Sequence, residues 1–139
     1  MFRIGQEEID AVARVINSGK LFKVNDGTKE VFSFEDEMKE KFGTEYALFM
    51  TSGKAALISA LVGMGIGPGD EVIVPGYTYI ATAIAVVAAG AIPIISEIDD
   101  SLTLDPVDVE KKITPNTKAI IPVHIQGLPC KMDELMAIG

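Results

Sequence analysis

A serine, a glycine and a lysine stand at the junction between two apolar runs, and their types suit an anion-binding site. Ser52 can cap a helix, because its hydroxyl accepts a hydrogen bond from a free N–H group of the first turn. Gly53 lets a ligand approach the backbone closely. The N–H groups of Gly53, Lys54 and Ala55 would then lie at the positive end of the helix dipole, where a phosphate is the natural occupant. The alternative is a capped helix that binds nothing.

Two common nucleotide-binding motifs do not match this chain. A Walker A loop would need glycine at position 48 and a hydroxyl residue at position 55, where the sequence has Leu48 and Ala55. The glycine-rich run from Gly63 to Gly69 does not fit the dinucleotide-binding pattern, and it follows a helical run instead of opening one. We therefore interpret that run as a helix end followed by a turn.

The composition favours one ordered domain in a reducing compartment. The 139 residues are 48% hydrophobic, which is enough for a core and argues against disorder. The net charge of −8 disfavours a nucleic-acid partner. A single cysteine, Cys130, excludes an internal disulfide, and the early acidic residues of the N-terminus leave no apolar core for a signal peptide. We expect a cytoplasmic protein.

The uncharged stretch from Val72 to Ser96 is long enough to cross a membrane. Pro75, Gly76, Gly90 and Pro93 divide it into pieces of strand and helix length. We therefore expect buried elements of an α/β core here and no membrane span.

Apolar periodicity, capping residues and glycine stops predict an alternation of helices and strands. The predicted helices are 7–17, 34–42, 55–63, 78–89, 106–112 and 131–138. The predicted strands are 46–50, 71–74, 92–98 and 118–123. An Asn-Asp-Gly sequence at 25–27 predicts a turn. Asp105 is the expected cap of the fifth helix, with Pro106 in its first turn and Asp108 at the capping-box position.

The predicted strands are nearly continuous apolar runs, which is typical of a parallel sheet covered by helices on both faces. Ligands of such sheets bind at the carboxyl ends of the strands. Those ends are residues 50–54, 75–79, 97–99 and 124–127, and the candidate site residues converge there. Because the chain ends one helix after the last predicted strand, we expect an incomplete α/β domain.

Several segments occur together in a recognisable order. They are residues 43–57, 65–75, 77–82, 89–93, 105–106 and 113–124. In these segments the chain resembles the DegT/DnrJ/StrS family of pyridoxal-phosphate-dependent sugar aminotransferases. The resemblance runs over nearly all of the chain, but it covers only the N-terminal third or so of what family members contain.

The resemblance implies an N-terminal portion of the large domain of an aspartate-aminotransferase-type (fold type I) enzyme. Residues 1–139 would form this portion, with a helical segment at 1–45 and the αβ sheet portion at 46–139. It also implies a homodimer with active sites at the subunit interface. The full-length protein would transfer an amino group, commonly from glutamate, to a keto-sugar carried on a nucleotide, although some relatives aminate cyclitols.

Five residues match positions that contact the cofactor, pyridoxal 5′-phosphate, in this family. Ser52, Gly53 and Lys54 would hold its phosphate. The family usually has Thr in place of Lys54, so the lysine either pairs with the phosphate as a point charge or points to solvent. Tyr79 would stack on the pyridine ring, the alternative being a core aromatic residue, and His124 would line the site.

Two further positions depart from the family pattern. Asn116 and Lys131 stand where relatives more often have Arg and Asp. We interpret both as surface variation.

No catalytic residue and no metal ligand is assigned. The resemblance places the Schiff-base lysine, and the acid that pairs with the pyridine nitrogen, beyond position 139. We therefore expect the chain to be inactive alone. The alternative hypothesis is a non-catalytic module that binds a phosphate, a cofactor or another protein, from a truncated gene.

Overall fold

The computed structural model describes residues 4–23 and 29–139, so the turn predicted at 25–27 lies outside the described residues. The chain divides into an N-terminal unit, Met1–Phe49, and a sheet unit, Met50–Gly139. Each unit is described by itself.

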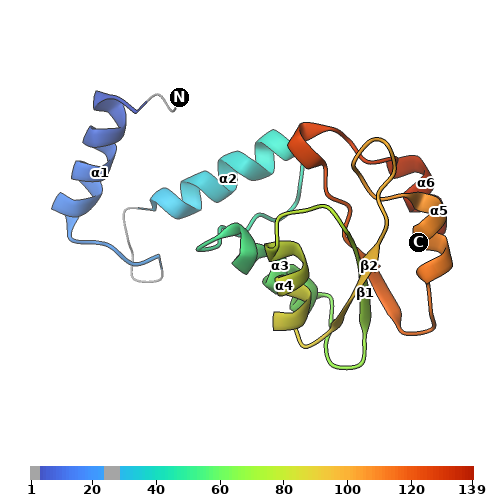
Figure 1. The fold of residues 1–139 in the computed structure, drawn as a ribbon. Helices are drawn as coiled ribbons and strands as arrows, with labels where there is room; N and C mark the ends of the chain where they lie inside the picture. Colours follow the sequence, from blue (N-terminus) through green and yellow to red (C-terminus); the bar gives the residue numbers. More distant parts are fainter. Residues whose placement is uncertain (1–3, 24–28) are drawn as a thin grey trace. The chain divides into compact units, whose positions relative to one another are not determined.

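The N-terminal unit contains two helices, α1 (Gln6–Ser18) and α2 (Glu30–Phe42), in its described part (Figure 1). Each ends at a glycine in the left-handed conformation, Gly19 with φ 66° and Gly43 with φ 65°. Glycine adopts this conformation without the penalty that a side chain brings, and this confirms both predicted helix ends. Helix α2 begins one turn earlier than predicted, with the acidic Glu30 at its positive N-terminal end.

The strand predicted at 46–50 is wrong. The run is apolar, but Tyr46 and Leu48 are 80% and 70% exposed, and no described strand pairs with it. The Phe49 N–H donates instead to a carboxylate oxygen of Glu35, 2.7 Å away. An apolar run becomes a strand only when a neighbouring strand accepts its backbone hydrogen bonds.

The sheet unit is a parallel α/β structure (Figure 1). Its three strands lie in the order β2-β1-β3. Its elements are α3 (Gly53–Gly63), β1 (Glu71–Pro75), α4 (Ala81–Ala88), β2 (Ile92–Ser96), α5 (Pro106–Lys112), β3 (Thr117–Ile120), the short 3-10 helix η1 (Ile125–Gly127) and α6 (Met132–Ile138). The predicted fold class is confirmed.

Strand β1 is the centre of the core, because successive side chains point to opposite faces of the sheet. Val72 and Val74 pack in one cluster with Leu61 of α3 and Val86 of α4. Ile73 packs on the other face. Its partners are Leu104, Val109 of α5, Cys130 and Leu135 of α6. Helices therefore cover both faces, and each fully buried aliphatic side chain contributes about 1.5–3 kcal/mol.

Two strands end earlier than predicted. Strand β3 ends at Ile120, close to Pro122, which has no N–H to donate to a ladder. Strand β2 ends at Ser96, and Ile98 forms an isolated antiparallel bridge with Leu104. The uncharged stretch 72–96 contains all of β1 except its first residue, Glu71, and the whole of α4 and β2. In the part of the chain that the structure describes, no helix has the length and apolarity needed to cross a membrane.

Helix α5 is fixed by two aspartates with different roles. Asp105 caps it as predicted, accepting from the Val107 N–H at 3.0 Å. Asp108 does not form the expected capping box. Its Oδ2 accepts from the Glu97 N–H and the Ser96 hydroxyl, each at 2.8 Å, and these contacts lower the pKa of Asp108 to about 2. The carboxylate therefore joins the end of β2 to α5.

Candidate functional site

The start of α3 has free backbone donors. Ser52 caps the helix as predicted, and its hydroxyl oxygen accepts from the Ala55 N–H at 3.1 Å. That hydrogen bond uses one of the three N–H groups that we expected to be free. Among the described residues, nothing accepts from the N–H of Gly53 or of Lys54. Two donors thus remain at the positive end of the helix dipole.

Gly53 leaves open space in front of these donors. A Cβ placed on Gly53 would meet no other atom within 4 Å. The space beside the backbone is therefore accessible to a ligand, and a side chain at this position would fill it.

A hollow of about 970 Å³ lies in front of this helix start. It is formed by the start of α3, by the segment that follows β1, and by the segment that follows β3. Its lining residues are Ser52, Gly53, Lys54, Leu57, Thr78, Tyr79, Ile80, Ala81, Thr82, Ile84, Val123, His124, Ile125 and Gln126. The structure thus brings together all five residues that the sequence suggested for cofactor binding, at the carboxyl ends of β1 and β3.

The charge of the hollow suits an anion. Lys54 is the one lysine or arginine among the lining residues named above, and no aspartate or glutamate is among them. An ammonium group, two free N–H groups and the helix dipole all favour negative charge at the same place.

His124 lines this hollow and carries one ring N–H donor. Its Nδ1 accepts from the Cys130 N–H at 3.0 Å, which assigns the ring proton to Nε2. No described residue accepts from Nε2.

Tyr79 is 78% exposed, so it is not a core aromatic residue. It lies two residues before the first residue of α4, and its carbonyl accepts from the Thr82 N–H at 3.0 Å. The Thr82 hydroxyl in turn bonds that of Thr78 at 2.9 Å. The backbone at Tyr79 is therefore fixed, and its ring is free to contact a flat ligand.

The end of the third predicted strand, which we also expected at the site, lies elsewhere. Residues 97–99 do not line the hollow. Asp99 forms an ion pair with Lys131, with 2.8 Å between Oδ2 and Nζ, and Ser101 donates to Oδ1 of the same carboxylate. The Lys131 ammonium, followed by the Ser101 hydroxyl, lowers the pKa of Asp99 to about 2, and Asp99 raises the pKa of Lys131.

Lys131 is exposed, as its interpretation as surface variation requires, and its ammonium forms an ion pair with Asp99 on another loop. Asn116 is exposed, as that interpretation requires.

Sequence reasoning missed several lining residues. Thr78 and Thr82 flank Tyr79 at helical spacing, and that spacing is a signal that could have found them. Gln126 reaches the hollow from a left-handed backbone conformation with φ 51°, which nothing in the local sequence indicates.

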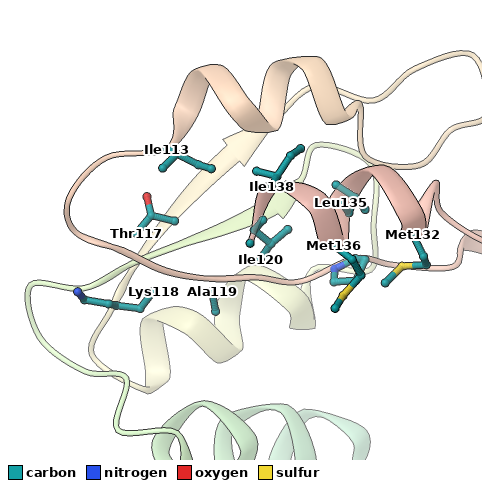
Figure 2. Close-up of a pocket in the computed structure, with 11 residues that line it drawn as sticks. Ile113, Thr117, Lys118, Ala119, Ile120, Met132, Leu135, Met136 and Ile138 are labelled. Carbon is teal, nitrogen blue, oxygen red and sulfur yellow. The ribbon is translucent and has the colours of Figure 1, made fainter.

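A second hollow lies along β3 (Figure 2). Its volume is about 500 Å³, and apolar side chains of β3 and α6, among them Ile120, Met132 and Met136, face it. It contains none of the predicted site residues. Lys118 is the one charged residue among those that line it.

Comparison with known proteins finds relatives that match nearly the whole chain. The chain is 48% identical over 130 residues to dTDP-3-amino-3,4,6-trideoxy-α-D-glucose transaminase of Streptomyces venezuelae, covering 93% of the chain and 33% of that protein. It is 43% identical over 137 residues to the spore coat polysaccharide biosynthesis protein SpsC of Bacillus subtilis (strain 168), covering 98% of the chain and 34% of that protein.

A solved structure also matches. NtdA from Bacillus subtilis with bound cofactor PMP superposes with a TM-score of 0.87 at 32% identity, over 97% of this chain and 31% of that one. The chain thus spans about a third of the length of the curated relatives that it matches. The family model of the DegT/DnrJ/EryC1/StrS aminotransferases matches residues 3–139, and the chain belongs to that family.

Proposed function

We propose that this chain supplies the phosphate-binding part of the active site of a pyridoxal-phosphate-dependent sugar aminotransferase. The observation that carries the proposal is the pair of free N–H groups at Gly53 and Lys54, in a hollow whose lining includes Lys54 and no acidic residue. The family and its sugar-processing relatives support it.

The lining residues fit the cofactor group by group. The N–H groups of Gly53 and Lys54 donate to phosphate oxygens, and the Lys54 ammonium offsets the phosphate charge. The Ser52 hydroxyl accepts from the Ala55 N–H and still has its own proton to donate to the phosphate. The exposed ring of Tyr79 suits stacking on a flat heterocycle, and His124 supplies an Nε2–H donor.

In the whole protein we propose transfer of an amino group from a donor such as glutamate to a nucleotide-linked keto-sugar. The bound cofactor supplies the electron sink for this exchange. We further propose a cytoplasmic homodimer, as the family resemblance implies, with neither nucleic acid nor membrane as a partner.

This chain's own part is to bind and orient the cofactor. Lys54 is the one lysine among the residues that line the hollow, and it stands at the phosphate-binding end. We therefore propose that the 139-residue chain is inactive alone. With pyridoxal 5′-phosphate and glutamate it should show no turnover above a boiled control, and steady turnover would contradict this.

The direct test of the site is calorimetric binding of pyridoxine 5′-phosphate to the 139-residue chain, with pyridoxine as the control. Neither compound has an aldehyde, so neither reacts with exposed lysines. Charge-assisted hydrogen bonds to the phosphate should make pyridoxine 5′-phosphate bind about tenfold more tightly or better. Equal affinities would show that the hollow does not recognise phosphate.

Two alanine variants on one helix sharpen this test. Gly53→Ala places a methyl group in the open space before the donors, whereas Gly63→Ala places one in open space at the other end of α3. Neither glycine has a positive φ, so the backbone tolerates both changes. Gly53→Ala should weaken pyridoxine 5′-phosphate binding about tenfold, and Gly63→Ala should not.

A further inference from the structure

Two hydrogen bonds join Cys130 to residues 123 and 124 within the segment that follows β3. The N–H of Cys130 donates to His124 Nδ1 at 3.0 Å, and the Cys130 thiol donates to the Val123 carbonyl at 3.2 Å. Cys130 is only 5% exposed and packs in the core with Ile73 and Leu104. A buried residue thus holds both the ring of His124 and the backbone beside it.

The next residue, Lys131, is fastened to a different loop. Its Nζ lies 2.8 Å from Oδ2 of Asp99. Asp99 is itself fixed, because its Oδ1 accepts from the Ser101 N–H at 2.8 Å and its own N–H donates to the Thr103 carbonyl at 3.1 Å. Its side chain is only 14% exposed. The ion pair therefore joins the Cys130–Lys131 segment to a rigid anchor after β2.

Other acidic groups also face Lys131. Asp100 and Glu134 both lie close enough to act on its charge, but Asp99 makes the direct contact. Removing the Lys131 ammonium would leave Asp99 without its cation and would remove the side-chain link between the Cys130–Lys131 segment and the loop after β2.

We propose that Cys130 and the Asp99–Lys131 ion pair are positioning elements that hold His124 as an Nε2–H donor to the ligand of the hollow. This inference rests on the proposed function of that hollow. The ring proton is on Nε2 because Nδ1 is occupied by the Cys130 N–H, so a displaced Cys130 frees the ring to turn. None of these three positioning residues lines the hollow.

The chain is well suited to a spectroscopic test, because His124 is its single histidine. In the ¹⁵N-labelled chain, nuclear magnetic resonance should detect a coupling across the hydrogen bond between the Cys130 amide nitrogen and His124 Nδ1. Long-range ¹H–¹⁵N spectra of the one imidazole should show the proton on Nε2.

Three lysine variants separate positioning from a general structural effect. Lys131→Met removes the ion pair, and Lys131→Arg retains it. Lys111→Met is the matched control, because it removes an exposed charge from α5 for which no ion pair is found among the described residues. Circular dichroism verifies that each variant is folded.

Lys131→Met should reduce or abolish the coupling and weaken pyridoxine 5′-phosphate binding about threefold, the scale of one partly lost hydrogen bond. Lys131→Arg should keep both the coupling and the affinity for pyridoxine 5′-phosphate, and Lys111→Met should change neither of them. A coupling and an affinity that Lys131→Met leaves unchanged would overturn the inference while the proposed function stands. A wild-type chain without the coupling would also overturn it. A wild-type chain that shows the coupling but binds no pyridoxine 5′-phosphate would overturn the proposed function, and the ligand-directed part of this inference with it.

Discussion

The two units of the chain use apolar residues in opposite ways. In the sheet unit, Val72, Ile73 and Val74 of β1 are completely buried between two layers of helices. In the N-terminal unit, Ile9, Val12 and Ile16 recur at helical spacing along α1, yet each is more than half exposed. The buried hydrophobic side chains of the described residues all belong to the sheet unit.

This difference shows that the residues that define the ends of a helix do not by themselves create a buried core. Glycine stops end both α1 and α2, and Glu8 caps the start of α1, although no hydrophobic side chain of either helix is buried. Burial requires a second apolar surface, which β1 finds on both of its faces. The stability of the 139-residue chain should therefore reside in the sheet unit.

The largest effect should come from the centre of that core. Ile73→Ala should lower the free energy of unfolding by about 2–5 kcal/mol, because it leaves a cavity between the sheet and α5 and α6. The milder Ile73→Val should cost about 1 kcal/mol. Val12→Ala on α1 is the control and should cost less than about 0.5 kcal/mol. Denaturant unfolding followed by circular dichroism measures all three, and an equal loss for Val12→Ala would contradict the comparison.

A smaller effect should follow from the carboxylate that joins β2 to α5. Asp108→Asn should cost about 1–3 kcal/mol, because the charged acceptor of the Glu97 N–H and the Ser96 hydroxyl is lost. Glu110→Gln, an exposed change in the same helix, should be nearly neutral.

The same carboxylate makes stability depend on pH. The folded pKa of Asp108 is about 2, below its ordinary value of 3.8. Its contribution is therefore complete above the ordinary pKa and is lost as the pH falls through about 2. Asp99 behaves in the same way. Asp108→Asn should reduce the loss of stability between pH 4 and pH 2, and an unchanged pH profile would show that this carboxylate is not the cause.

The smallest effect on stability should come from the buried carboxylate of the N-terminal unit. Glu35 accepts from Lys23 and from the Phe49 N–H, and these contacts lower its pKa. Glu35→Ala should speed hydrogen exchange at the Phe49 amide and leave the unfolding of the sheet unit unchanged. Glu37→Ala, an exposed change in α2, should leave that amide unaffected. Slow exchange in the Glu35→Ala variant would show that the amide is protected by another group.

The sequence predicts those parts of the site that depend on neighbouring residues better than those that depend on contacts between loops. Ser52 and Gly53 mark the start of α3 because capping depends on residues next to one another in the chain. The apolar runs predict a buried parallel sheet, but the run at 46–50 shows that apolarity alone does not supply a pairing strand. The Asp99–Lys131 ion pair depends on how two loops meet, and the left-handed backbone at Gln126 has no signal in the local sequence.

The start of α3 is the proposed binding site for a phosphate ester. The most direct test is a ¹H–¹⁵N nuclear magnetic resonance titration of the 139-residue chain with pyridoxine 5′-phosphate. The largest shifts should occur at the amides of Gly53 and Lys54, with smaller ones at Tyr79 and His124, and none at Gly63. Shifts confined to the apolar hollow along β3, or no shifts at Gly53 and Lys54, would show that the start of α3 does not bind the phosphate.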